Sequence, residues 1–245
     1  MNTSVMDISQ IIVGGLPVEV VRKDIKNLHL GVYPPHGRVR VAAPFAVSNE
    51  AIRLAVIGKL GWINRKRRGF EAQERQSRRE YVTGESHYFL GRRYRLRVEH
   101  AESAPQIRLA NKSTLLMRVR PSLDSDQRGQ AMNEWYRAYL KATIPNLLEE
   151  WTPIIGAAPA SWRVQRMKTK WGSCNDRTSH ILLNLELAKK PVQCLEYILV
   201  HELTHLLERN HNERFIQIMD AVMPLWRLHK QTLNAAPLAH EEWEY

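Results

Sequence analysis

The chain of 245 residues is 44% hydrophobic and 25% charged, and its formal net charge at neutral pH is +11. This composition is typical of a soluble globular protein with one sizeable core or two modest ones, and no apolar run approaches the roughly 18 residues that a membrane span requires. Two cysteines are too few for a disulfide framework and form no CxxC pair, so we expect reduced thiols.

Positive charge is concentrated in the first half of the chain. Residues 1–120 hold 22 lysines and arginines against 10 acidic residues, whereas residues 121–245 hold 14 against 15. This asymmetry indicates that the N-terminal region contacts an acidic partner, such as nucleic acid or an acidic protein surface. The first residues, MNTSVMDISQIIVGG, lack the basic start and apolar stretch of a secretory signal, which favours a cytoplasmic protein.

Short β-rich runs separated by glycine and proline occupy residues 11–41 and predict a small antiparallel meander or set of hairpins. Ser48 then stands where a helix N-cap is expected, and the apolar spacing after it predicts one long helix that Gly69 could interrupt. This helix carries the densest positive segment, residues 64–68 (NRKRR), continued by Arg75, Arg78 and Arg79. The segment is either a phosphate-binding surface or a solvated helix face.

Alternating patterns predict further strands between residues 87 and 120, followed by a second long helix from about Asp126 to Trp151 that a proline- and glycine-containing linker closes. Two strands, WRVQRM and HILLN, flank the turn-rich segment WGSCNDRTS. Two helices complete the pattern, from about Val192 through Leu207 and from about Asn212 through Val222. Together these elements predict an α+β fold with a basic, β-rich region at residues 1–120 and a second region at residues 121–245.

The segment His201-Glu202-Leu203-Thr204-His205 lies in the strongly apolar helical context EYILVHELTHLLE. Residues i and i+4 share one helix face, so the imidazoles of His201 and His205 can hold one zinc ion. Glu202 can then serve as general base toward a water that the metal activates. A chance HExxH match is the alternative, but polar groups in apolar surroundings require a partner, which favours a metal site.

A catalytic zinc site uses three protein ligands, and His211 is the leading candidate for the third. Six residues after His205, a continuous helix would point this side chain to a different face, so the helix must end between the two histidines. Asn210 tolerates the left-handed conformation common at helix ends and could provide the turn. Glu208 or Glu213 remains an alternative carboxylate ligand.

The run WGSCNDRTSHILLNLELAKKPVQCLEYILVHELTHLLERNHNERFIQIMDAVMP resembles the YgjP-like metallopeptidases, relatives of the SprT and WLM groups of zincin proteases. The segments LHLGVYPPHGRVRVAAP, KLGWINRK and YFLGRRYRL are similar to the β-rich region of that family. The resemblance implies a zincin-like peptidase unit at residues 121–245, with Zn²⁺ bound by His201, His205 and His211 and with Glu202 as base for peptide-bond hydrolysis. Because SprT-type relatives act on DNA-associated proteins, it also suggests substrates associated with nucleic acid.

An edge strand beside the site takes up extended substrate in zincins, and the predicted strand His180–Asn184 is the candidate for that role. An internal structural strand is the alternative interpretation. Trp171, Gly172 and Ser173 form a turn that either borders the cleft or serves packing.

The competing functional hypothesis is a nucleic-acid or protein-binding module with a structural zinc ion and no hydrolysis. Three protein ligands and an intact Glu202 argue against it, because structural zinc sites normally close all four positions. Cys174, as a fourth ligand, would favour it.

Overall fold

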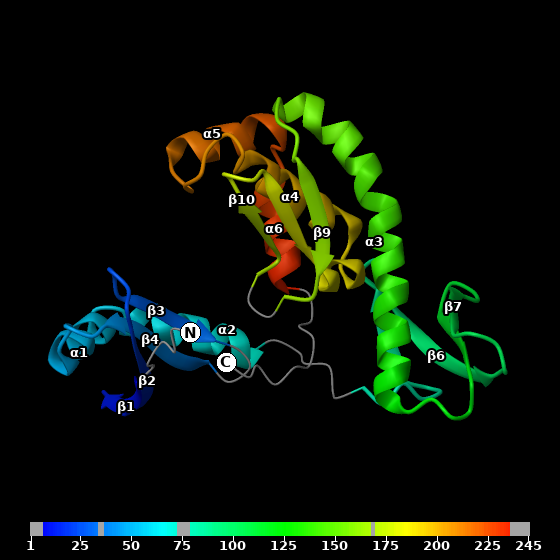
Figure 1. Ribbon diagram of the computed structural model, residues 1–245, viewed down its shortest axis with the longest axis horizontal. Coiled ribbons are helices and arrows are strands. Elements are labelled where there is room, and N and C mark those ends of the chain that lie inside the picture. Colours follow the sequence, from blue (N-terminus) through cyan, green and yellow to red (C-terminus); the bar gives the residue numbers. More distant parts are fainter. Residues whose placement is uncertain (1–6, 34–36, 73–78, 168–169, 236–245) are drawn as a thin grey trace, which may run out of the picture. The chain divides into compact units, whose positions relative to one another are not determined.

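The computed structural model describes residues 7–33, 37–72, 79–167 and 170–235 (Figure 1). It contains helices and several small sheets, which confirms the predicted α+β class. The chain forms two compact units, Met1–Arg75 and Gln76–Ala239. This division differs from the predicted one at residue 120, because the strands between residues 86 and 119 share a core with the long helix that follows them. Among the described residues, no helix combines the length and apolar character needed to cross a membrane.

The described residues of the first unit form one four-stranded sheet and two helices. The strands are paired in the order β1-β2-β4-β3, and β2 and β4 run parallel, so the predicted antiparallel meander was wrong at that pair. The two outer pairs are antiparallel, as predicted. The elements are β1 (Asp7–Val13), β2 (Leu16–Lys23), β3 (His29–Tyr33), β4 (Arg38–Pro44), α1 (Asn49–Ile57) and α2 (Leu60–Ala72).

Two helices stand where one long helix was predicted. Ser48 is the N-cap of α1, and its hydroxyl accepts a hydrogen bond from the Ala51 N–H at 3.2 Å, as expected. The interruption occurs at Gly58 rather than at Gly69, which lies inside α2. Glycine is a poor helix former, and the break allows Ile52 of α1 and Ile63 of α2 to bury in the same core cluster.

The second unit begins with a four-stranded sheet that packs against one long helix. The predicted strands are β5 (Ser86–Phe89), β6 (Arg92–His100), β7 (Gln106–Leu109) and β8 (Thr114–Val119), in the order β5-β6-β8-β7, and the helix is α3 (Ser125–Ile155). A capping box between Asp124 and Gln127 starts α3. Gly156, with a φ of 76°, ends it four residues beyond the predicted Trp151.

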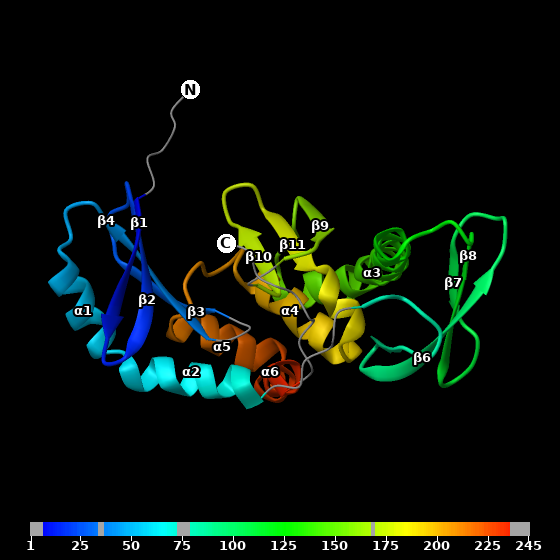
Figure 2. The same ribbon diagram turned by 90° about the horizontal axis from the view of Figure 1, so that it is seen from below.

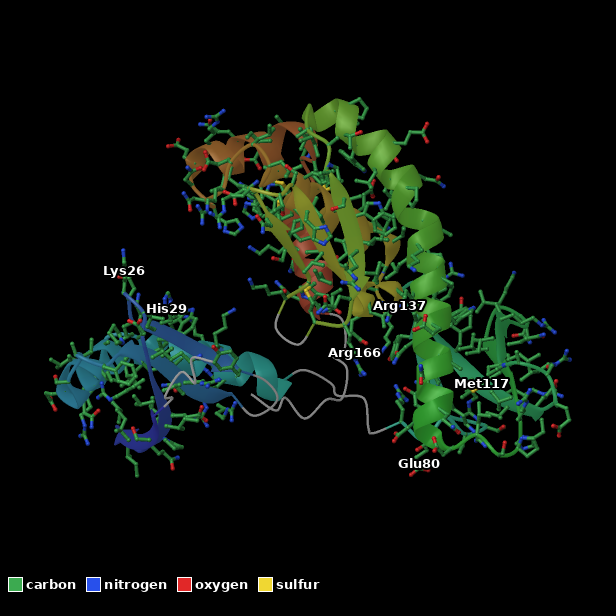
Figure 3. The ribbon with its side chains drawn as sticks, viewed as in Figure 1. Lys26, His29, Glu80, Met117, Arg137 and Arg166 are labelled. Atoms are coloured by element: carbon green, nitrogen blue, oxygen red, sulfur yellow. The ribbon has the colours of Figure 1, made fainter. Side chains whose placement is uncertain are left out.

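A three-stranded sheet, one 3₁₀ helix and three α-helices complete the described part of the second unit. They are β9 (Ser161–Gln165), β10 (Gly172–Asn175), β11 (His180–Asn184), the short 3₁₀ helix η1 (Leu185–Lys189), α4 (Val192–Thr204), α5 (Glu213–Val222) and α6 (Trp226–Ala235). Figure 2 shows the sheet on one side of α4 and helices α5 and α6 on the other. Arg137 connects α3 to the three-stranded sheet, because its guanidinium donates a hydrogen bond to the Val164 carbonyl of β9 at 2.7 Å (Figure 3).

Candidate metal centre

Helix α4, which packs into the second unit's core, contains His201 and ends at the residue before His205. Nine of its thirteen residues are buried, and it packs on β10, β11, α5 and α6. Apolar burial explains why such a sequence is helical here, since most helical stability in proteins comes from tertiary packing. Thr204, fully buried, donates its hydroxyl to the Val200 carbonyl at 2.8 Å and therefore leaves no unpaired polar group.

The helix ends at Thr204, three residues before the predicted Leu207 and just before His205. It therefore does not continue to His211, which is what the spacing between His205 and His211 required. His205 is its C-cap, and the Glu208 N–H still bonds the Thr204 carbonyl at 3.0 Å. The prediction of a left-handed Asn210 was wrong, because Asn210 is not among the non-glycine residues with positive φ. A side-chain contact makes the turn instead: the Glu208 carboxylate accepts the Asn210 N–H at 3.1 Å.

The three predicted histidines converge on one point. The Nε2 atom of His211 lies 3.0 Å from Nε2 of His201 and 3.1 Å from Nε2 of His205. These three side chains form a group whose ligand atoms all lie within 4.8 Å of one another. Glu208, Glu213 and Cys174 are not members of that group, so within the described residues no carboxylate or thiol completes it.

The arrangement fits a bound metal ion. A proton on the Nε2 atom of His211 can be donated to only one of its two neighbours, so hydrogen bonding does not account for the convergence. Tetrahedral zinc with Zn–N bonds of about 2.0–2.1 Å would separate its nitrogen ligands by about 3.3 Å, close to the observed spacings. Three imidazole nitrogens are also a donor set that suits zinc and the neighbouring transition metals.

Burial keeps the first histidine neutral and therefore able to act as a ligand. Burial, followed by the neighbouring His205 and His211, lowers the pKa of His201 to about 3. The pKa of His211 is also lowered, first by burial. The Nδ1 atom of His205 lies 3.1 Å from the Glu208 carbonyl, and a proton held there leaves the Nε2 lone pair free for a metal.

Phe215 supports all three imidazoles and was not predicted from the sequence. Its ring centroid lies 5.0 Å from that of His201 and 4.8 Å from those of His205 and His211. Asn212, the N-cap of α5, fixes the turn before it by accepting the Phe215 N–H at 3.0 Å. One feature of the sequence could have predicted this role. Asn212 is a typical N-cap residue, and a helix that starts there places Phe215 in its first turn, close to His211.

Glu202 is buried beside the histidines, with 5% of its surface exposed. Burial raises its pKa to about 8, and the positive charge of Lys170 opposes that shift. The Glu202 carboxylate packs against Gly172, the first residue of β10. Any side chain at that position would clash, since a methyl group there would lie 2.5 Å from the Glu202 Oε1 atom. Residues 171–173 therefore border the site, which is one of their two predicted roles, although Gly172 and Ser173 belong to strand β10 rather than to a turn.

The substrate-strand prediction was wrong for His180–Asn184. This strand, β11, lies between β10 and β9 in the sheet, so its backbone groups pair on both sides. The outer strands of this sheet are β9 and β10, and the one beside Glu202 is β10, for which the sequence predicted a turn. It is four residues long, and its glycine, serine and asparagine are typical of turns.

The predicted basic segment at residues 64–68 lies on α2 in the first unit, where four of its five residues are exposed. Arg75 and Arg78 lie outside the described residues. The two cysteines are free thiols, as expected.

A family model described as a YgjP-like metallopeptidase domain matches residues 26–236. No curated protein matches the chain at a significant level. Among solved structures, the chain is similar to the crystal structure of the metallopeptidase zymogen of Pyrococcus abyssi abylysin, with 22% identity over 37% of this chain and 91% of that chain. The TM-score of that comparison is 0.35.

The raised pKa of Glu202 predicts a pH-dependent stability of the metal-free protein. Between the ordinary value of 4.5 and about 8, the folded chain holds a proton that the unfolded chain has released, so stability present below pH 4.5 is lost as pH rises through this window. Glu202→Gln removes that loss. We expect its free energy of unfolding, obtained from thermal unfolding with a chelator present, to exceed that of the wild type by an amount that grows toward pH 8 and is on the order of a few kcal/mol at most.

The exposed Glu213 of α5 offers a matched control, because Glu213→Gln removes a carboxylate of ordinary exposure nearby. A stability difference for Glu202→Gln that stays constant across the pH range would contradict the assigned burial of Glu202.

Proposed function

The chain belongs to the YgjP-like metallopeptidase family, and we propose that it hydrolyses peptide bonds with zinc held by His201, His205 and His211 and with Glu202 as the general base. The observation that carries this proposal is the convergence of three Nε2 atoms at 3.0–3.1 Å beside a buried carboxylate. Histidine nitrogens and an adjacent carboxylate are what hydrolysis by an activated water requires.

The metal ion and the residues around it would have separate roles in hydrolysis. Zinc, when bound, supplies a Lewis acid that polarises a carbonyl and lowers the pKa of water toward ~7. Glu202 accepts a proton from the attacking water and returns it to the leaving amine, so no covalent intermediate with the chain is formed. Gly172 keeps the space beside the carboxylate open, and Phe215 holds the three rings in position.

The edge strand β10 is the part of the site best suited to hold an extended substrate. It pairs with β11 on one side, and within the described residues no strand pairs with it on the other. A peptide that adds to an edge strand gains main-chain hydrogen bonds along its length. Because β10 begins at Gly172, a peptide paired with it would pass close to Glu202.

Proteins associated with nucleic acid are the proposed substrate class. The support is the charge of the first 120 residues, which hold 22 lysines and arginines against 10 acidic residues. A positive region of this kind favours binding to phosphate backbones, which brings proteins on the same nucleic acid near the site.

A structural zinc site without hydrolysis is less well supported. Such sites normally use four protein ligands, and Cys174, the thiol that could have provided the fourth, is not part of the histidine group. A centre with three histidines and an adjacent buried carboxylate instead leaves a position for water and substrate.

Glu202→Gln tests the catalytic role directly. The amide cannot accept the proton of the attacking water, so we expect hydrolysis of an unfolded protein substrate such as casein to fall by at least about 10²-fold. Zinc content by elemental analysis should stay that of the wild type, because the three histidines are unchanged. Retained hydrolysis would remove Glu202 from the mechanism, and loss of zinc together with activity would leave its role as base without support.

Gly172→Ala tests the space that β10 leaves for Glu202. The added methyl group cannot share the position of a carboxylate 2.5 Å away, so we expect kcat to fall by about 10-fold or more while zinc content is unchanged. Gly69→Ala is the matched control, since no atom lies within 4 Å of a methyl group at that position. Full activity in Gly172→Ala would show that the carboxylate does not need the observed geometry.

A further inference from the structure

The four-stranded sheet of the second unit has one buried face and one face open to solvent. Tyr94 and Leu96 of β6 and Leu115 and Met117 of β8 lie in the core, each at most 6% exposed, with residues of α3. Successive side chains of a strand point to opposite faces, so the residues between these form the other face. Figure 1 shows β6 and β7 beside α3 at one end of the unit.

Five arginines occupy the solvent face and are called the arginine face below. Three of them alternate along β6, one lies on the neighbouring strand β8, and one lies on the edge strand β7: Arg93, Arg95, Arg97, Arg118 and Arg108. The strand register sets Arg97, Leu116 and Arg108 in one row across the sheet and Glu99, Arg118 and Gln106 in the next. All five arginines are exposed.

The positive charge of this face is only partly balanced. Glu99 is its single acidic residue among the strand positions, and it bonds Arg97 at 3.1 Å and Arg118 at 3.0 Å. Within the part of the chain that the structure describes, no salt bridge joins a carboxylate to Arg93, Arg95 or Arg108. Five arginines and one glutamate leave a surplus of four positive charges on this face.

We propose that the arginine face binds the phosphate backbone of a nucleic acid, without regard to base sequence. Guanidinium groups match phosphate oxygens with two parallel hydrogen bonds, and arginine is less strongly hydrated than lysine. Alternate residues of β6 stand about 6.8 Å apart, so Arg93, Arg95 and Arg97 present a regular row of donors to a chain of phosphates. Release of condensed counterions supplies the free energy of such binding.

The other side chains of this face favour nucleic acid over a lipid surface. Binding to a membrane is strengthened by apolar side chains that enter it, but Leu116 is only 4% exposed. Tyr88 is half-buried and lies in register with Arg93, so an aromatic ring stands next to the row of guanidinium groups. An aromatic side chain there can stack on an unpaired base.

This proposal does not depend on the peptidase function. It assigns the nucleic-acid contact to a surface on the second unit, whereas the densest positive segment of the sequence, residues 64–68, lies on α2 in the first unit. The two surfaces can therefore be tested against each other with variants that remove the same charge.

The test measures binding of a fluorescein-labelled oligonucleotide, single-stranded and as a duplex, by the full zinc-loaded chain at several salt concentrations. In the triple variant Arg93→Gln, Arg95→Gln and Arg108→Gln, we expect the dissociation constant to rise at least about tenfold. We also expect the slope of log K against log salt to become shallower, by up to about 0.9 for each duplex phosphate that the variant no longer neutralises. These three arginines have no salt-bridge partner among the described residues, so their replacement leaves no carboxylate unpaired.

The matched control is Arg65→Gln, Lys66→Gln and Arg68→Gln, which removes three exposed charges from α2. It should bind within about twofold of the wild type. An equal loss of affinity in both triple variants, unchanged binding in the arginine-face variant, or binding of the wild type to phosphatidylserine vesicles but to neither oligonucleotide would overturn the proposal. Zinc content and thermal unfolding report on folding, and if the triple variant unfolds, the single changes Arg95→Gln and Arg108→Gln should each weaken binding several-fold.

Discussion

A buried carboxylate between two half-buried histidines, at the end of an otherwise apolar helix, is the constraint on which this structure depends. Helix α4 is packed on all sides by its own unit, yet it carries His201 and Glu202 into that core. Unpaired polar groups are costly in such surroundings. In the second unit His211 lies beside His201 and His205, so a single cation could bind all three imidazoles and offset this cost.

The elements around α4 can be understood as supports for that arrangement. The helix stops at Thr204, the chain turns through residues 205–211, and the N-cap of α5 then fixes Phe215 against the three rings. On the opposite side of Glu202, Gly172 opens β10 with no side chain in the way. Helix α3 holds the sheet that contains β10 through the hydrogen bond from Arg137 to Val164. Phe215 and Gly172 therefore lie directly against the three histidines and the Glu202 carboxylate.

Local sequence patterns predicted most of the site, and long-range pairing explains most of the errors. The spacing of His201 and His205 is a property of one helix, and the helix break before His211 follows from the same geometry. The position of β11 inside its sheet depends on β9 and β10, which no local pattern reveals. Strand β10 was missed because its composition is typical of a turn, and its contact with Glu202 joins residues thirty positions apart in the sequence.

The most direct measurement of the central claim is the zinc content of the purified protein, expressed without a metal-binding tag, beside that of His211→Ala. Three converging histidines predict about one zinc ion per wild-type chain and a large loss of zinc in the variant, because His211 is the ligand that the helix break brings back to the site. A folded wild-type protein that takes up no metal even after zinc is supplied would contradict the account.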